Sequence, residues 1–459
     1  MQHTQGHQRD SAQYILADVR IFRSLIRLSV PAMIGLLVNT LYTMVDMLFV
    51  GQSVGPLGIA ALGMSLPVYL LITGIALMMG VGGASLLSRE LGAQQTEAAG
   101  KTASVSLFVT LTIITILAFI ALFSFRSLAQ VLGATHTTYT GIKNYLTIVL
   151  WGAPVISTAV VLNAQLRAQG EAKRAMTANI IGNGLNILLD ALFILVFGWG
   201  VAGGAAATVI GQSCAALYAL QFLHSSRSAV TFHRFTIREL IMKSRSITAI
   251  GSPTLIRQLG TSAVTLVANR MLVRYSGTTA VAAYALVGTL FMFFNMPISG
   301  VVQGFQPLAA YQYGAKNLHQ VRRVLLLSTV LVITIGLSIL LCALLMPRFF
   351  LGLFTKEGEL ITEAVPVLLI ICATLPLLGI QSIGTACFQS IGKAAPALML
   401  WILRQGVLLI PLIVLLGTHV GTIGIYVAFP LADTISALIV LLTIRYRLFS
   451  REHTIKDMP

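Results

Sequence analysis

The sequence predicts an all-α polytopic membrane protein, with twelve transmembrane helices in two pseudo-symmetric six-helix bundles. Of the 459 residues, 56% are hydrophobic and only 10% are charged, whereas a soluble domain carries about 25% charged residues. Many apolar runs reach the length of about 20 residues that a membrane-spanning helix needs. They must be helical, because a backbone in lipid has to satisfy its own hydrogen bonds. Finally, the two halves of the chain repeat each other.

The individual helices follow from apolar runs that are bounded by glycine, proline and charged residues. The polar segment before the first run lacks the charged-then-apolar pattern of a cleaved signal peptide, so we expect this run to remain as a true span. The predicted spans are 28–50, 57–81, 101–124, 143–165, 175–197, 203–223, 249–274, 281–310, 323–346, 361–386, 396–416 and 422–445.

An internal repeat divides these spans into two sets of six on either side of the polar stretch His224–Ser246. A single constant offset in residue number superposes landmarks of the two halves. These are Pro31 on Pro253, Gly82 on Gly304, Gly92-Ala93 on Gly314-Ala315, Pro154 on Pro376 and Gly170 on Gly392. Because each copy has an even number of spans, both copies have the same topology, and a substrate cavity is expected between them.

The predicted domains follow this division. They are a cytoplasmic N-terminal segment (1–27), an N-terminal six-helix lobe (28–223), a cytoplasmic connection between the lobes (224–248), a C-terminal six-helix lobe (249–445) and a cytoplasmic tail (446–459).

Basic residues predict the orientation in the membrane. The formal net charge of +16 would suit a nucleic-acid-binding protein, but no basic stripe is interleaved with aromatic residues and no nucleic-acid motif is present. Instead, 22 of the 30 lysines and arginines lie in one set of tails and connections, and only four lie in the other set. Because an excess of Lys and Arg marks the cytoplasmic side, we expect both termini in the cytoplasm and a multi-pass protein of the inner plasma membrane.

Cysteine and histidine predict no metal or redox chemistry. The four cysteines, Cys214, Cys342, Cys372 and Cys387, lie in apolar stretches without a CxxC pair, which argues against a disulfide framework and a zinc site. All eight histidines lie outside the span interiors, which argues against a histidine proton relay. With no nucleophile–base grouping and no phosphate-binding loop, the sequence predicts neither an enzyme nor a cofactor.

Only three of the fourteen acidic residues lie in the interior of predicted spans, namely Asp46, Asp190 and Asp433, and the others lie in tails, loops or helix ends. A carboxylate at the middle of a spanning helix costs about 2.5–3.5 kcal/mol on insertion scales, so it usually faces a cavity, a partner or an ion path. Asn186 lies four residues before Asp190 and shares its helical face. A rise of about 1.5 Å per residue places these groups of the first half, together with Thr208, near the outer end of their helices.

Asp46, Asn186, Asp190 and Thr208 therefore form a predicted site for a coupling ion. Two carboxylates, an amide oxygen and a hydroxyl suit a hard cation such as sodium, in which case the four residues are metal ligands. Repulsion between buried carboxylates would favour a proton instead. The alternative is separate hydrogen bonds that lock the helices together. The second half has no equivalent site, since the corresponding residues are Ala268, Leu408, Leu412 and Pro430.

Candidate substrate contacts lie in both halves. Asp433 and Arg257 are two of them. Asp433 has Arg257 and Arg404 as candidate ion-pair partners, and either a structural pair or a substrate contact is consistent with the sequence. Aromatic residues and methionines suit the binding of flat, apolar cations, although ordinary packing explains them equally well. The further candidates are Phe291, Phe294, Met296 and Gln303 in the eighth span, and Asn163 and Gln165 in the fourth span.

Six strings of the sequence carry a family resemblance. They are VDMLFVG at 45–51, SRELGA at 88–93, LRAQGEAKRAM at 166–176, LNILLD at 185–190, GFQPLAAYQYGAKN at 304–317 and LRQGVLLIP at 403–411. With them the chain resembles multidrug and toxic compound extrusion (MATE) transporters over nearly its full length, in particular the bacterial branch that exports cationic drugs and dyes.

The resemblance implies two six-helix lobes in a V-shaped arrangement, alternating access by rocking, and a cation site in the first lobe. That site matches Asp46, Asn186, Asp190 and Thr208. Some relatives carry acids in helices seven or ten, and this sequence has none in the interior of those spans.

The function expected from these observations is secondary active multidrug efflux by a monomer in the lipid bilayer. Hydrophobic organic cations, as small-molecule substrates, would leave in exchange for inward protons or sodium. The alternative is a lipid-linked or oligosaccharide flippase of the same superfamily, which would need a cationic lining for anionic headgroups. A channel or a membrane receptor is a further alternative, but the sequence contains neither a selectivity ring nor a sensory domain.

Overall fold

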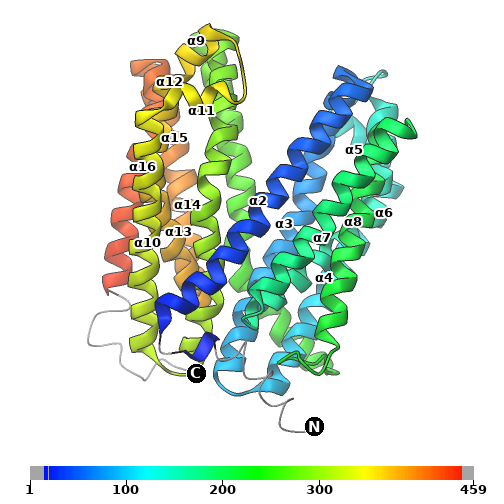
Figure 1. Ribbon diagram of the computed structural model, residues 1–459, viewed down its shortest axis with the longest axis vertical. Coiled ribbons are helices and arrows are strands. Elements are labelled where there is room, and N and C mark those ends of the chain that lie inside the picture. The colour runs from blue at the N-terminus through cyan, green and yellow to red at the C-terminus, as the bar shows by residue number, and fades with distance from the viewer. Residues whose placement is uncertain (1–14, 19, 447–459) are drawn as a thin grey trace. The chain divides into compact units, whose positions relative to one another are not determined.

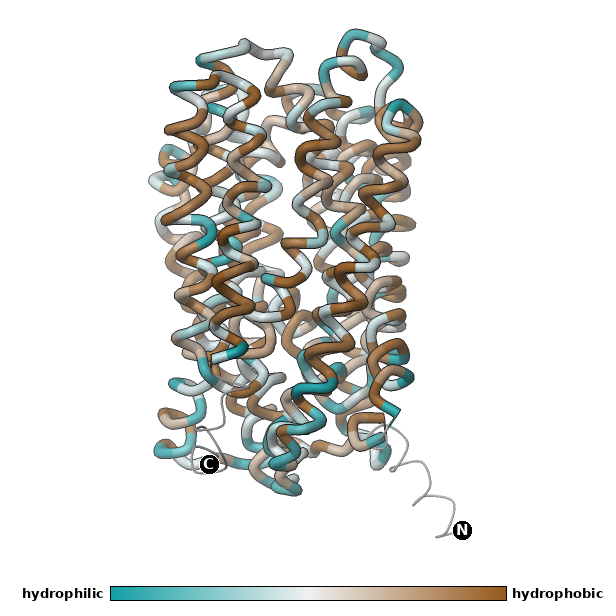
Figure 2. Tube along the Cα trace, turned by 90° about the vertical axis from the view of Figure 1, so that its left-hand side faces the viewer, coloured by the Kyte–Doolittle hydropathy of each residue, from teal (hydrophilic) through white to brown (hydrophobic). Residues whose placement is uncertain are grey.

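The computed structural model describes residues 15–18 and 20–446, with the side chain of Thr278 left out. Most of the predicted tail lies outside these residues, as do positions 1–14 and 19 of the predicted N-terminal segment. Within them the chain forms helices and no strand, which confirms the predicted all-α fold. Figure 2 shows the helices hydrophobic over most of their length, with hydrophilic residues gathered toward their ends.

The helices are named as in Figure 1, and π-helical segments carry the letter η. The first half of the chain forms α2 (Ile21–Val54), α3 (Pro56–Gly92), α4 (Thr96–Phe123), α5 (Phe125–Val131), α6 (Tyr139–Ala168), α7 (Ala172–Asp190), η1 (Ala191–Val196) and α8 (Gly200–Leu223). The second half forms α9 (Ile237–Gly314), α10 (Leu318–Leu345), α11 (Pro347–Gly352), α12 (Gly358–Cys372), α13 (Leu375–Ser390), α14 (Ala394–Ile402), η2 (Leu403–Leu409), α15 (Ile410–Val420) and α16 (Thr422–Ile444).

Each predicted span lies on one or more of these helices. Ten helices in the described part of the chain are long and apolar enough to cross a membrane, and an eleventh span forms if the bent pair α12 and α13 counts as one. The predicted span 249–274 lies in the first part of α9, where Arg257, Arg270 and Arg274 interrupt the apolar run. Gly277, with a φ of 75°, separates it from the span 281–310.

Several helices are longer than the apolar runs predict. The helix α3 continues to Gly92 rather than ending near residue 81, and α2 begins at Ile21. Hydropathy marks only the part of a helix that lies in lipid. Beyond it, hydrogen bonds to neighbouring helices hold the helix in place. The buried Ser88, for example, donates to the carbonyl oxygen of Ala168 over 2.8 Å. The helices α5 and α11 were not predicted, because 7 and 6 residues are too few for a periodic signal.

The described residues form two compact units. The N-unit comprises 15–18 and 30–255, and the C-unit comprises 20–29 and 256–446. Two helices therefore change unit along their length: α2 begins in the C-unit and α9 begins in the N-unit. Within the N-unit, α6 packs against α3, α4 and α8, and within the C-unit α13 packs against α10 and α16. Figure 1 shows the helices of each unit running along its long axis.

The backbone confirms the internal repeat. Three pairs of residues with positive φ are related by the same offset that superposes the sequence landmarks. These are Gly55 and Gly277 (75° and 75°), Gln94 and Lys316 (61° and 59°), and Gly170 and Gly392 (88° and 78°). Residues other than glycine, such as Gln94 and Lys316, rarely adopt positive φ. The paired values therefore show that the turns at these three places have the same geometry in both halves.

Each unit also contains the same close helix crossing. A Cβ on Gly82 would lie 2.0 Å from the carbonyl oxygen of Ile247, and a Cβ on Gly251 would lie 1.9 Å from that of Met78. The backbones of α3 and of the first part of α9 therefore touch inside the N-unit. In the C-unit, a Cβ on Gly304 would lie 2.5 Å from the hydroxyl oxygen of Ser29. These are repeat-related positions, so the start of each crossing helix is held in the same way.

Candidate functional site

Two glycines bring α7 and α8 together at the predicted ion site. A Cβ on Gly211 would lie 2.4 Å from the carbonyl oxygen of Gly182 and 3.2 Å from the Cβ of Asn186. Small residues at such an interface allow transmembrane helices to approach closely. This approach buries Asn186 on α7 next to Thr208 on α8.

The amide of Asn186 connects the predicted ligands of α7 and α8. In the orientation that satisfies both ends of this amide, its nitrogen donates to Oδ2 of Asp190 over 3.2 Å. Its oxygen then accepts from the backbone N–H of Thr208 over 3.0 Å. With the amide turned over, the nitrogen lies 3.3 Å from the Thr208 hydroxyl oxygen. The predicted pairing of Asn186 with Asp190 on one helical face is therefore present, and Thr208 contacts it.

Gly204, one turn before Thr208 on α8, is the place where the two predicted carboxylates meet. The position that a Cβ would take on Gly204 lies 2.8 Å from Oδ1 of Asp46 and 3.9 Å from Oδ1 of Asp190. Both oxygens are buried, and neither accepts a hydrogen bond from the described residues. An unpaired, buried carboxylate oxygen is costly. A proton or a cation bound between the two carboxylates would remove that cost.

The donor set at this position consists of oxygen atoms from two carboxylates, one amide and one hydroxyl. Hard monovalent cations and protons bind such oxygen atoms, whereas zinc and copper prefer nitrogen and sulfur ligands. Among the described residues, no group of three or more His, Cys, Asp or Glu side chains could hold a metal ion. The geometry therefore fits sodium or a proton better than a transition metal.

A π-helical segment follows the second carboxylate directly. The segment η1 (Ala191–Val196) begins at the residue after Asp190. The backbone N–H of Phe197 donates to the carbonyl oxygen of Leu192, five residues earlier, over 2.9 Å. Such π-bulges are frequent at functional sites, because they interrupt the regular hydrogen-bond ladder of a helix.

Three tyrosines border the site, and the sequence analysis did not identify them. The buried Tyr42 lies one helical turn before Asp46, and its hydroxyl lies 3.4 Å from that of Tyr69 on α3. Tyr145 on α6 packs against the buried cluster of Val50, Ile194 and Val201. The spacing of four residues between Tyr42 and Asp46 was a usable signal in the sequence, whereas Tyr69 and Tyr145 come from other helices.

The other polar candidates of the N-unit have partners inside the protein. The side-chain nitrogen of Asn163 donates to the carbonyl oxygen of Ala175 over 2.8 Å and to Asn179 over 2.9 Å. The side-chain nitrogen of Gln165 donates to the carbonyl oxygen of Ala103 over 3.0 Å. These contacts bind α6 to α7 and to α4, and a role in substrate binding stays a prediction.

In the C-unit, the structure pairs Asp433 with Arg404. The Nε of Arg404 donates to Oδ1 of Asp433 over 2.5 Å, and both side chains are buried. Arg257 is exposed and stacks near Trp401 instead, with 5.8 Å between its guanidinium carbon and the ring centroid. The sequence left open which arginine pairs with Asp433, because their distance depends on tertiary packing.

The four candidates on the second part of α9 differ in their burial. Phe294 packs edge-on against Phe350, with 5.3 Å between ring centroids. Met296 is buried, whereas Phe291 and Gln303 are half-buried. Their predicted role as a lining for substrate remains a prediction.

Comparison with known proteins gives the family. The family model described as MatE matches residues 31–192 and 253–415, which together make up most of the chain. The chain belongs to the MatE family. The two matched stretches begin at Pro31 and Pro253, which are also the first pair of landmarks in the internal repeat. Members of this family are transporters and not enzymes, as the sequence predicts.

Relatives and solved structures extend the comparison over nearly the whole chain. Multidrug export protein MepA of Staphylococcus aureus (strain MRSA252) is 27% identical over 439 residues, covering 95% of this chain and 96% of that protein. An outward-facing conformation of a multidrug resistance MATE family transporter of the MOP superfamily aligns with a TM-score of 0.88 and 28% identity, covering 93% of this chain and 95% of that one.

A third similar protein is a MOP superfamily transporter from Pyrococcus furiosus Vc1 (DSM3638). It is described as having a binding pocket of reverse polarity that suggests a different function, and it aligns with a TM-score of 0.89 and 27% identity over 96% of this chain and 98% of that one. These two solved structures are about equally similar to this chain, yet they are described as having different functions. Family membership gives a multi-pass membrane transporter, and the charge of the substrate has to be argued from the residues of this chain.

Proposed function

We propose that the protein is a secondary active exporter of hydrophobic organic cations, driven by the inward movement of protons or sodium. The observation that carries this proposal is the meeting of Asp46 and Asp190 beside Gly204, with two buried carboxylate oxygens that have no partner among the described residues. The similarity to a multidrug export protein supports the transport of drug-like molecules.

The proposed mechanism uses one anionic site for two competing cations. A substrate cation is attracted by the negative charge of Asp46 and Asp190 while these two residues are ionised. A proton or sodium ion then enters from outside, neutralises the carboxylates and releases the substrate. Coupling requires that the ion binds one conformation more tightly than the other. An inward monovalent ion gains about 2.3 kcal/mol per 100 mV of membrane potential, in addition to its concentration gradient.

The acids of the N-unit favour cationic cargo over the flippase alternative. A flippase for anionic headgroups needs a cationic lining along its path, and the carboxylates at Gly204 would repel such cargo. Transport that does not depend on Asp46 and Asp190 would favour the flippase.

The test is ethidium export from sealed vesicles under an imposed sodium or proton gradient, each applied alone. We expect Asp46→Asn and Asp190→Asn each to abolish gradient-driven export, while the amount of protein inserted in the membrane stays unchanged. Glu97→Gln is the matched control, because it removes an acid at an exposed ion pair with Lys101, outside the site. Export by both Asp variants at the wild-type rate would contradict the proposal.

A further inference from the structure

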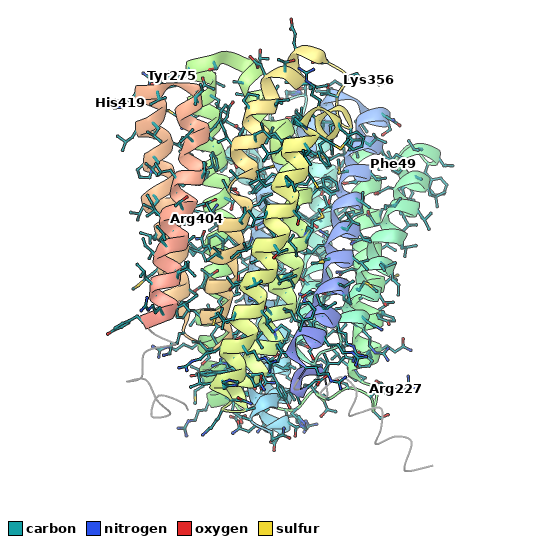
Figure 3. All side chains as sticks on the ribbon, turned by 60° about the vertical axis from the view of Figure 1, so that its left-hand side comes forward. Phe49, Arg227, Tyr275, Lys356, Arg404 and His419 are labelled. Atoms are coloured by element: carbon teal, nitrogen blue, oxygen red, sulfur yellow. The ribbon has the colours of Figure 1, made fainter. Side chains whose placement is uncertain are left out.

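The C-unit carries its own group of charged residues, halfway along its helices. The buried ion pair of Arg404 and Asp433 joins η2 to α16. Asp433 lies at the middle of α16, about 16 Å from either end at 1.5 Å per residue. Figure 3 shows Arg404 about halfway along the helices of this unit, whereas Tyr275 and His419 lie at one end.

Arg257 adds a positive charge that nothing in the described chain balances. Its side chain is exposed and makes no hydrogen bond or ion pair with the described residues. The guanidinium groups of Arg257 and Arg404 both lie 5.8 Å from the ring centroid of Trp401. Two arginines and one aspartate leave a net charge of about +1 at mid-membrane depth. An unpaired guanidinium in hydrocarbon is costly, so this group must face a water-filled space.

The local backbone is irregular at the same place. Arg404 and Gln405 lie in the π-helical segment η2. The side-chain nitrogen of Gln405 donates to the hydroxyl of Thr261 over 3.1 Å, and Thr261 lies one helical turn after Arg257 on α9. Thus α9 and η2 each hold one arginine close to Trp401, and a π-helical segment such as η2 often marks a functional site.

The internal repeat shows what this region looks like without the charges. The residues of the first half that correspond to Arg257, Arg404 and Asp433 are all glycines: Gly35, Gly182 and Gly211.

The helix contacts are kept between the copies. Gly182 touches Gly211, just as Arg404 touches Asp433. Asn183 lies 3.5 Å from Asn39, in the positions that correspond to Gln405 and Thr261.

At these corresponding positions, uncharged residues therefore hold the helices together in the N-unit. A buried ion pair is weak evidence for added stability, because desolvation offsets the attraction between its charges. Helix packing therefore does not explain the charged residues of the C-unit. The binding of a charged ligand would explain them.

We propose that Arg257 and Arg404 form a binding site in the C-unit for the carboxylate group of zwitterionic substrates. A guanidinium binds a carboxylate through paired, charge-assisted hydrogen bonds. The ring of Trp401 keeps the two guanidinium groups in place and offers a flat surface to an aromatic substrate. Lipid phosphate is a weaker candidate for the same chemistry, since the middle of a hydrocarbon core about 30 Å thick lies about 15 Å from the headgroups. The inference rests on the proposed drug export and specifies part of its substrate range.

The test compares two dyes that differ in one group, rhodamine 110 and rhodamine 123. The first has a free carboxylate, and the second is its methyl ester. Ion-driven transport is measured in proteoliposomes for the wild type, Arg257→Gln and Arg257→Lys. We expect Arg257→Gln to raise the apparent KM for rhodamine 110 at least tenfold and to change that for rhodamine 123 less than twofold. The lysine variant should recover part of the loss.

Arg270→Gln is the matched control. It removes the same charge from an exposed position of α9, and 13 residues at about 100° each place it on the opposite face from Arg257. It should change neither KM. Because transport of rhodamine 123 by Arg257→Gln also reports on folding, equal changes for both dyes, or no change for either, would overturn the proposal.

Lipid composition separates the two sources of the anionic group. If rhodamine 110 transport depends on the content of phosphatidylglycerol, and Arg257→Gln removes this dependence, the site binds lipid phosphate and our assignment is wrong. Failure of the proposed function gives a different result: the wild type would then show no ion-driven export of rhodamine 123, and both proposals would fall.

Discussion

At the scale of single residues, the most informative position is one without a side chain. Gly204 leaves open a space beside the buried oxygens of Asp46 and Asp190. Hydropathy marks the two aspartates in the sequence, because a carboxylate in an apolar run is conspicuous. A glycine among the 40 of this chain gives no such signal, so its role follows only from the packing of α2 and α7 against α8.

The first prediction concerns this space. We expect Gly204→Ala to reduce ion-driven export at least tenfold, because the new methyl group would lie 2.8 Å from Oδ1 of Asp46 and would occupy the space proposed for the ion. The measurement is gradient-driven ethidium export, together with equilibrium binding of ethidium, which should persist.

Gly184→Ala on α7 is the control for this variant, since no atom lies within 4 Å of the added carbon. It should leave export unchanged. Wild-type coupling in Gly204→Ala would mean that the ion does not bind between the two carboxylates.

At the scale of elements, the two repeat-related crossings decide how each long helix is held at its start. In the N-unit, the beginning of α9 also makes a half-buried ion pair, in which Nζ of Lys243 donates to Oε1 of Glu90 over 2.6 Å and to the hydroxyl of Thr102 over 2.6 Å. Hydropathy did not predict this part of α9, because a helix that ends in polar, hydrogen-bonded contacts needs no apolar run.

The second prediction concerns the crossing of α3 and α9. We expect Gly82→Ala to destabilise the protein by about 1–3 kcal/mol, as overpacking does, because its Cβ would lie 2.0 Å from the carbonyl oxygen of Ile247. Alanine is otherwise the better helix former by about 1 kcal/mol. A loss of stability would therefore come from the close contact with Ile247, whereas a gain would come from helix propensity.

Gly63→Ala on the same helix provides the comparison, since its added carbon meets nothing within 4 Å. It should keep or slightly raise the melting temperature in detergent, whereas Gly82→Ala should lower it. A higher melting temperature for Gly82→Ala would show that α3 and α9 do not touch at this point.

At the scale of the whole molecule, the two units are repeats of each other that carry different polar and charged groups. The ion site of the N-unit corresponds to Ala268, Leu408, Leu412 and Pro430 in the C-unit, and the charged group of the C-unit corresponds to three glycines in the N-unit. The repeat keeps the backbone turns, as the paired positive φ values show, while the polar side chains have diverged.

The third prediction concerns orientation, which the placement of lysine and arginine implies. In a variant without the four native cysteines, Arg227→Cys should react with a membrane-impermeant maleimide only after intact cells are permeabilised. Lys356→Cys should react in intact cells. Both positions are exposed at an end of their unit, and Figure 3 labels them. The reverse pattern would invert the assigned topology.

The sequence by itself determined the all-helical membrane fold, the internal repeat of the two halves, the two acids of the proposed ion site and the family. These properties depend on composition, on apolar runs and on residue spacing, which are local or periodic features. Only the tertiary structure decided that Gly204 lies beside Asp46 and Asp190, that Arg404 rather than Arg257 pairs with Asp433, and that tyrosines from α2, α3 and α6 lie near the ion site. These facts depend on distances between different helices, which are set by how closely the helices pack.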